Sequence, residues 1–285
     1  MSLEKARELV EGIEDLPTLP EVVIEITRLV ENPDTTAEDV YRLVSTDLSL
    51  SATMLKLVNS AFYGMPKSVT SLEKAIRILG FATVRNIALA AFVFDAFMTG
   101  KGKFDYRGFW LHSIATAAAC DIMAKRLRVK DIGEYFVYGL LHDLGMVVLM
   151  QYFPDGLTRI REQSMQAADV DVPKVEEKEM GCNHGELGAA LAERWEFPAS
   201  LVSVIGSHVS DEMAEGNKRE VAIVRCAGNV AHALEIGSSL SFLIPYIGEE
   251  VWQAAGISPD QLGGVMDETL REMEHSKAFI DLLYR

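Results

Sequence analysis

An apolar run at residues 138–150, YGLLHDLGMVVLM, contains two polar side chains, His142 and Asp143. A polar pair in such surroundings must be satisfied locally or bind something that compensates its burial. If the run is one helix, the two side chains project about 100° apart and can both reach a single cation. The alternative is a polar pair at a helix end, in which Asp143 accepts a hydrogen bond from His142 or from a backbone N–H. The dipeptide alone leaves both interpretations open.

Helix signals recur along the whole chain, whereas the sequence lacks the sustained polar and apolar alternation that marks strands. We therefore expect an all-α fold built as a multi-helix bundle. The expected helices span residues 4–13, 21–30, 37–44, 48–60, 71–79, 82–98, 107–127, 131–150, 157–167, 184–195, 198–208 and 219–236, and a last long one begins near 258.

Local sequence patterns predict where some of these helices begin and where the chain runs along the surface. Thr36 followed by Asp39 predicts a capped helix start, and Thr70 followed by Glu73 predicts another. Residues 169–181 are acidic and poor in large apolar side chains, so we expect a surface excursion there.

The segment Thr99–Lys103, TGKGK, is polar and glycine-bearing between two apolar segments, which predicts a linker. We expect an N-terminal helical subdomain at residues 1–100 and a second helical subdomain with a C-terminal helical extension at 101–285. The second unit carries all six histidines. The long C-terminal helix could pack on its own domain or on a second copy, and we favour its own domain.

The formal net charge of −15 opposes docking onto a nucleic-acid backbone or an anionic membrane surface. Short helices within 36–60 could form a helix-turn-helix, but this charge favours an ordinary bundle. The most apolar stretch, 87–98, is too short to span a bilayer and contains Asp95, and the N-terminus lacks an apolar leader core. We therefore expect a cytoplasmic protein. Three widely spaced cysteines without a CxxC exclude a thiolate zinc cluster.

Four histidines and one aspartate lie on or at the ends of expected core helices: His112, His142, Asp143, His184 and His208. One such histidine would usually be a satisfied packing residue. Several together in an all-helical chain point to a metal site, because bundles build such sites from inward side chains on facing helices. His232 and His275 lie on amphipathic C-terminal helices, where we expect surface or packing residues.

These residues resemble the HD superfamily of metal-dependent phosphohydrolases, through GLLHDLG at 139–145 and the three further histidines. The N-terminal half narrows the resemblance to the HDOD (HD-related output domain) family of bacterial signalling proteins. The blocks that carry it are LPTLPEVV at 16–23, STDLSLSATMLKLVNSAFYG at 45–64 and SLEKAIRILGFATVRNIAL at 71–89. The resemblance covers roughly residues 10–210.

The resemblance implies a metal site in the helical core. The ligands by that pattern are His112, His142, Asp143, His184 and His208. Neutral imidazoles and a carboxylate suit one divalent ion of Fe, Mn, Ni or Zn, and we expect no organic cofactor. Such an ion normally lowers the pKa of a bound water and so supplies a nucleophile.

Four positions depart from the catalytic members that the chain resembles. Met146 stands where the HDxGK form has lysine, and Val209 stands where cyclic di-GMP enzymes have a further histidine. Asn229 aligns with a distal aspartate, which leaves an uncharged and weak ligand. Gly108 occupies the place of a glutamate ligand in the trinuclear enzymes. These losses remove charge that would stabilise a phosphoryl transition state.

The resemblance and its departures favour a non-catalytic regulatory protein that acts through contacts with a signalling partner. Its histidine cluster would then be a metal-stabilised core or a sensor of a small nucleotide. The alternative is a metal-dependent phosphohydrolase or phosphodiesterase acting on a nucleotide or cyclic dinucleotide, since five donors are retained. A DNA-binding regulator that uses residues 36–60 is a third and weaker hypothesis.

Overall fold

The structure is a computed structural model that describes residues 2–59, 68–97, 104–129, 132–165, 170–210, 213, 216–238 and 244–283. The side chains of 57 and 275–283 are not among the parts described. Those ranges hold helices and no strand, which confirms the predicted all-α class. The helices are α1 (Ser2–Glu11), α2 (Glu21–Glu31), α3 (Ala37–Val44), α4 (Leu48–Val58), α5 (Leu72–Leu79), α6 (Phe81–Phe97), α7 (Tyr106–Arg126), α8 (Ile132–Leu141), α9 (Leu144–Tyr152), α10 (Pro154–Ser164), α11 (Val172–Met180), α12 (His184–Arg194), α13 (Ala199–Ser207), α14 (Lys218–Ala233), α15 (Glu249–Ala255) and α16 (Leu262–Leu283), with a 3₁₀ turn, η2, at Pro259–Gln261.

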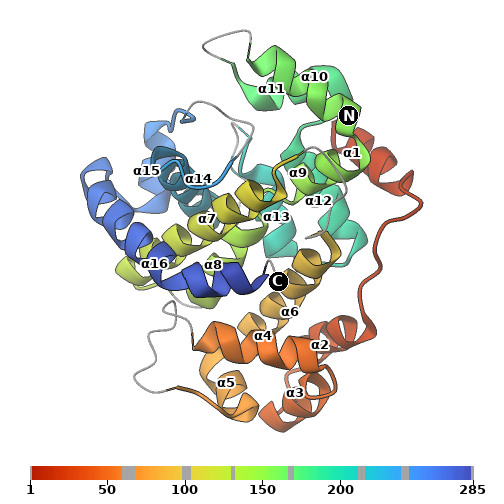
Figure 1. Cartoon of the computed structure of the whole chain (residues 1–285), viewed down its shortest axis with the longest axis vertical. Helices are drawn as coiled ribbons and strands as arrows, with labels where there is room; N and C mark the ends of the chain where they lie inside the picture. The colour runs from red at the N-terminus through yellow and green to blue at the C-terminus, as the bar shows by residue number, and fades with distance from the viewer. Residues whose placement is uncertain are drawn as a thin grey trace.

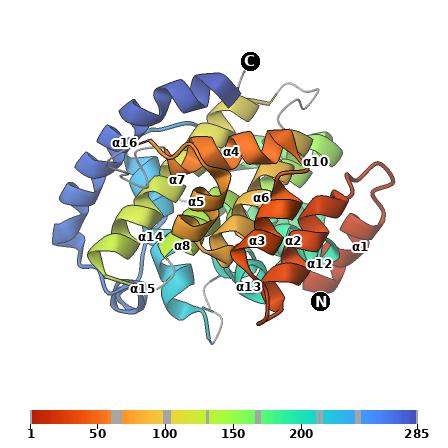
Figure 2. The same cartoon turned by 90° about the horizontal axis from the view of Figure 1, so that it is seen from below.

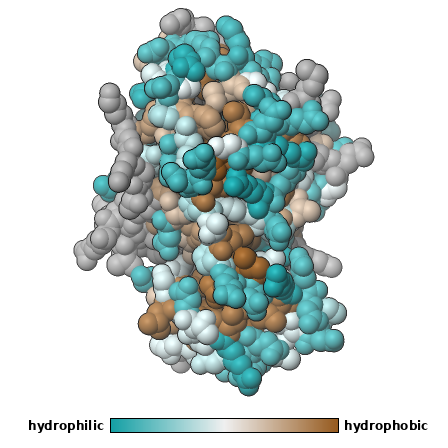
Figure 3. All heavy atoms as spheres, turned by 90° about the vertical axis from the view of Figure 1, so that its right-hand side faces the viewer, coloured by the Kyte–Doolittle hydropathy of each residue, from teal (hydrophilic) through white to brown (hydrophobic). Residues whose placement is uncertain are grey.

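The helices α2 to α5 form a lobe at the lower end of the molecule, and α6 runs from this lobe into the larger upper part (Figure 1). There α7 packs against α8, α14 and α16, while α12 packs against α9 and α13. The α10 and α11 pair lies at the opposite end from the α2–α5 lobe (Figure 1). The face to the right of that view is mainly hydrophilic, with smaller groups of hydrophobic atoms, one of them at the waist (Figure 3).

The N-terminal helix α1 does not lie in the α2–α5 lobe but packs against α12 (Figures 1 and 2). The Arg7 guanidinium donates two hydrogen bonds to Glu193, with distances of 2.8 and 3.0 Å. The indole Nε1 of Trp195 donates to the carbonyl oxygen of Pro17 at 2.9 Å. The first residues of the chain are thus joined to the helix that begins at His184.

The helix α7 is the centre of the upper part, because it is buried on every side over most of its length. Its alanines allow close packing. A Cβ on Gly139 of α8 would lie only 2.7 Å from the Cα of Ala117, so that α8 crosses α7 at near backbone contact. This crossing brings the end of α8, and with it His142, next to the histidine of α7.

The structure corrects the expectation of one helix over 131–150. Two helices, α8 and α9, meet at a turn formed by His142 and Asp143. The His142 ring donates to the carbonyl oxygen of Gly139, and Asp143 is the N-cap of α9 without a capping bond from its side chain. The pair therefore lies at the junction of two helices, which matches the alternative of a polar pair at a helix end.

Several other helix boundaries differ from those predicted from the sequence. The cap of α5 is Ser71, whose hydroxyl accepts from the backbone N–H of Lys74, and not Thr70. The expected surface excursion at 169–181 contains α11, which Gly181 ends in a left-handed conformation. The helix α15 was not predicted. The predicted linker Thr99–Lys103 lies outside the described residues.

By length and composition alone, the stretch Ile132–Tyr152 could cross a membrane, as could the pair α5 and α6 if their 109° bend were opened. Within the protein, however, 78% of the most apolar window of Ile132–Tyr152 is buried. Packing in the protein core therefore accounts for its apolar character.

Replacing Thr36 with alanine is expected to lower the free energy of unfolding by about 1 kcal/mol, because it removes the capping box of α3. The Thr36 hydroxyl accepts from Asp39 N at 3.3 Å, and the Asp39 carboxylate accepts from Thr36 N at 3.0 Å. Urea unfolding measures the change, and Thr18→Ala, an exposed threonine outside the helices, is the control. Equal effects of the two substitutions would contradict the assigned role of the cap.

Candidate metal centre

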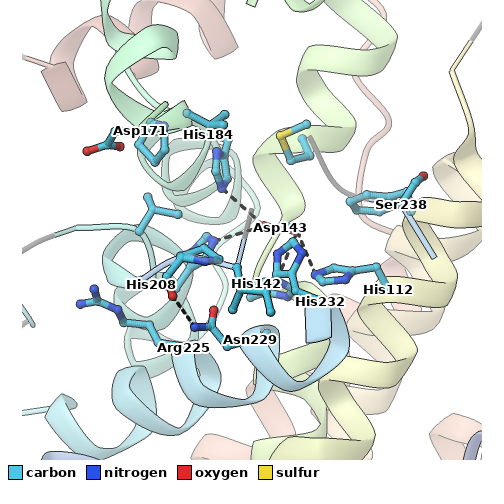
Figure 4. A pocket seen from close by; sticks show the side chains of 18 of the residues that line it. His112, His142, Asp143, Asp171, His184, His208, Arg225, Asn229, His232 and Ser238 are labelled. Atoms are coloured by element: carbon cyan, nitrogen blue, oxygen red, sulfur yellow. Dashed lines mark hydrogen bonds and ion pairs between the residues drawn. The ribbon is translucent and has the colours of Figure 1, made fainter. Parts of the chain in front are cut away.

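The five donors predicted from the sequence come together at one place in the upper part (Figure 4). They come from four parts of the chain: the first half of α7, the turn between α8 and α9, the first residue of α12, and the C-cap of α13. All five are buried: His112, His142, Asp143, His184 and His208. The packing of α7, α9, α12 and α13 thus converts a scattered sequence pattern into one cluster.

The carboxylate of Asp143 lies at the centre of this cluster. Its Oδ1 is 3.4 Å from Nε2 of His184 and 3.2 Å from Nε2 of His208. Its Oδ2 is 3.2 Å from Nε2 of His142 and 3.9 Å from Nε2 of His112. Two triads with mutually close donor atoms result, one with His112 and His142 and one with His184 and His208, and both share Asp143.

In His142 and His208, the contact of the outer ring nitrogen, Nδ1, determines whether the inner nitrogen, Nε2, carries a hydrogen. Nδ1 of His142 lies 2.8 Å from the carbonyl oxygen of Gly139, and Nδ1 of His208 lies 2.7 Å from that of Ile205. A carbonyl oxygen can only accept, so both Nδ1 atoms carry the hydrogen. In a neutral ring Nε2 is then a bare acceptor, and it faces Asp143, which is also an acceptor. Such a contact requires a cation or an extra proton between the two groups.

The charges in the cluster favour a cation. Burial would raise the pKa of Asp143, but the surrounding imidazoles outweigh burial and hold that pKa well below its usual value. Burial lowers the pKa of His112 to about 3 and that of His208 to about 4, so both rings are neutral near pH 7. Burial also lowers the pKa of His184, but Glu176 and Asp143 together raise it to about 10. His112 and His208 therefore have the protonation state in which imidazole binds metal, whereas His184 has to release a proton when an ion takes its place beside the ionised Asp143.

Two residues that the sequence analysis passed over belong to the site. Glu176 of α11 is completely buried and accepts from His184. His232 of α14, expected on the surface or in packing, instead lines the cavity, with its ring 4.7 Å from that of His112. The side chain of His275 lies outside the described parts. The acidic stretch that contains Glu176 is bounded by Pro173 and Gly181, which mark the two ends of a helix.

Asn229 and Gly108 lie beside the cluster without adding a charged ligand. Asn229 lines the cavity, but its side-chain nitrogen donates to the carbonyl oxygen of Pro245 at 2.5 Å. Gly108 faces the side chains of Asp105 and Ser238, with which any Cβ would overlap. The side chains of Asp105 and Ser238 therefore occupy the space that a side chain at position 108 would enter.

The cluster lies on the wall of a cavity of about 770 Å³, which is within the range of small-molecule sites. Arg161 of α10 and Arg225 of α14 contribute positive charge to the wall (Figure 4 shows Arg225), and Arg225 donates to the carbonyl oxygen of Ser210 at 2.9 Å. Met146 and Tyr246 are among the apolar and aromatic residues that complete it. The cavity has room for a small molecule beside the metal position.

Comparison with known proteins agrees with this architecture. Residues 16–210 match the HDOD domain, and the chain belongs to the HDOD family. An uncharacterized protein of Treponema pallidum (strain Nichols) is 31% identical over 211 residues, which are 71% of this chain but only 39% of that protein. The chain thus spans about two fifths of the length of this relative.

Two solved structures are similar over nearly their whole lengths. The first, an HDOD domain protein of unknown function from Geobacter sulfurreducens, has 26% identity and a TM-score of 0.72, with 98% of this chain and 95% of that chain covered. The second, from Shewanella amazonensis SB2B, is named as a candidate phosphohydrolase. It has 28% identity and a TM-score of 0.71, with 94% and 97% covered.

Proposed function

We propose that this chain is a metal-binding regulatory module of signal transduction that acts through protein contacts rather than through phosphoester hydrolysis. The observation that carries the metal part is the carboxylate of Asp143, which faces Nε2 of His142 and His208, two rings whose Nδ1 atoms already donate to carbonyl oxygens. One divalent ion of Fe, Mn, Ni or Zn, bound between the carboxylate and these Nε2 atoms, would relieve the contact between two hydrogen-bond acceptors. Its ligands are His112, His142, Asp143, His184 and His208, with Asn229 as a weak additional donor.

Three features support a role without catalysis. Met146 is buried next to the cluster, and its thioether provides no positive charge for a phosphate oxygen. The amide of Asn229 is engaged by Pro245 and brings no negative charge to the ion. Gly108 carries no side chain, and the side chains of Asp105 and Ser238 occupy the space beside it. The bound ion would therefore organise the core and offer a Lewis-acid position to a ligand in the cavity.

The alternative function, a metal-dependent phosphohydrolase or phosphodiesterase acting on a nucleotide or cyclic dinucleotide, is favoured by one observation. Arg161 and Arg225 line the same cavity as the metal cluster, and guanidinium groups suit phosphate. A regulatory module that senses a small nucleotide would use the same two arginines. Turnover, rather than binding, separates the two functions.

Elemental analysis of the purified protein is expected to find about one transition-metal ion per chain, and His142→Ala is expected to reduce that content several-fold. The control is His275→Ala, which removes a histidine of α16 that the sequence predicts to be a surface or packing residue. A metal-free, folded wild type would contradict the proposed centre.

The metal-loaded protein is expected to hydrolyse phosphoesters no faster than Asp143→Ala does, and turnover with Mn²⁺ or Fe²⁺ that Asp143→Ala abolishes would establish the enzyme instead.

We further propose a cytoplasmic location and a signalling protein as partner. The net charge of −15 supports a protein partner over nucleic acid or an anionic membrane. The absence of salt-dependent binding to duplex DNA at low ionic strength is the corresponding expectation.

A further inference from the structure

A second carboxylate, that of Glu176, lies beside the metal cluster, yet it is separate from the five proposed ligands. It is completely buried. Its two oxygens lie 2.7 and 2.9 Å from Nδ1 of His184, and one of them also accepts from the backbone N–H of His184 at 2.8 Å. A buried carboxylate is costly unless it is fully paired. Both of its oxygens are therefore committed to a single residue, the first of α12.

This contact fixes the direction of the His184 ring. With Nδ1 engaged by Glu176, Nε2 is the nitrogen left to face Oδ1 of Asp143, at 3.4 Å. The imidazoles of His142 and His208 instead donate from Nδ1 to neutral carbonyl oxygens. A charged acceptor makes an imidazole a stronger metal donor than a neutral one does. His184 is thus the ligand whose strength as a metal donor depends most on the group that its Nδ1 contacts, here the carboxylate of Glu176.

The hydrogen bonds between Glu176 and His184 also hold α11 against the beginning of α12. The neighbouring Glu177 accepts from the side chain of Asn183 at 3.0 Å, and Glu179 accepts from Arg159 of α10 at 3.0 Å. The beginning of α11, at 171–173, lines the cavity. A side chain that holds a metal ligand therefore belongs to the same helix that forms part of the cavity wall.

We infer that Glu176 is a positioning residue that orients His184 toward the ion and thereby makes metal binding and the docking of α11 on α12 depend on each other. This inference rests on the proposed metal centre. Because coupling between two equilibria is reciprocal, an ion that tightens the His184 contact must also stabilise the docked α11. The occupancy of the buried centre is then transmitted to a helix that forms part of the cavity wall.

The first test is metal affinity. Competition with a chromophoric chelator, using Co²⁺ or Zn²⁺ alone as the probe, is expected to show about 10 to 100-fold weaker binding in Glu176→Gln. The visible Co²⁺ spectrum is expected to change as well, because the ring of His184 is no longer held. The matched control is Glu162→Gln, which removes an exposed carboxylate from the neighbouring helix α10 and is expected to retain wild-type affinity.

The second test is hydrogen exchange of α11 in the wild-type protein with and without metal, which requires no variant. Added metal is expected to slow exchange over 172–180, and this effect is expected to vanish in Glu176→Gln. If the wild type binds metal but Glu176→Gln has the same affinity, or if α11 exchanges at the same rate with and without metal, the inference is wrong while the metal centre stands. A wild type that binds no metal overturns both proposals.

Discussion

Removal of the metal ion by a chelator is expected to lower the melting temperature of the wild-type protein by about 10 °C. An ion present at about 1,000 times its dissociation constant stabilises the folded state by about 4 kcal/mol, and each kcal/mol shifts the melting temperature of a chain of this size by about 2 to 4 °C. The structural cause is the cluster itself, in which the oxygens of Asp143 lie 3.2 to 3.4 Å from three imidazole nitrogens.

Scanning calorimetry in excess Mn²⁺ or Zn²⁺, and again with the chelator, measures this difference. The control is Asp143→Ala, which removes the carboxylate shared by both triads and is expected to melt at the same temperature under both conditions. An equal chelator effect in wild type and Asp143→Ala would show that the ion binds elsewhere in the protein.

Replacing Gly145 with alanine is expected to destabilise the protein by about 3 kcal/mol or more, at the upper end of what overpacking costs. A Cβ at this position would overlap the carbonyl oxygen of His184 and would lie 2.7 Å from the backbone nitrogen of Gly188. Both neighbours are backbone atoms of α12, so they cannot move aside as a side chain would. The same displacement would separate His184 from Asp143, so we also expect metal affinity to fall.

The matched control is Gly263→Ala in α16, where an added Cβ has open space. An alanine at an exposed helical position is expected to stabilise the protein by about 0.5 to 1 kcal/mol. Denaturant unfolding compares the two variants. If Gly145→Ala proved as stable as the wild type, the close crossing of α9 and α12 described above would be wrong.

The two glycines of the GLLHDLG block show what a sequence can and cannot reveal. The block predicted a polar pair in the core, and the structure explains its flanks. Gly139 permits contact with α7 and Gly145 permits contact with α12, the helices that carry His112 and His184. Which helices would cross at these glycines depends on tertiary packing, and a single sequence does not contain that information.

Glu176 was missed for a related reason. Its neighbours are charged and mostly exposed, so the local composition of 169–181 indicates a surface segment. A single buried carboxylate in a short amphipathic helix is too weak a signal to recognise without its partner. His232 was assigned to the surface or to packing, because its place at the cavity depends on the position of His112, which is 120 residues earlier in the chain.

Helix existence was predicted better than helix ends. The capping box at Thr36 is confirmed, since both of its hydrogen bonds are present. At α5 the choice between adjacent residues, Thr70 and Ser71, was wrong because either hydroxyl can serve as a cap. The break at His142 and Asp143 escaped prediction because the flanking residues favour continuation of the helix.

The joining of α1 to α12 has a consequence for how the chain folds. Arg7 and its partner Glu193 are 186 positions apart in the sequence, so the contact requires a long loop to close. At a synthesis rate of about 5 to 20 residues per second, α1 leaves the ribosome about 10 to 40 seconds before α12 exists. During that interval the buried face of α1, with Ala6 and Val10, has no partner. The helix α1 can thus reach its final place only after α12, the helix that carries His184, has been made.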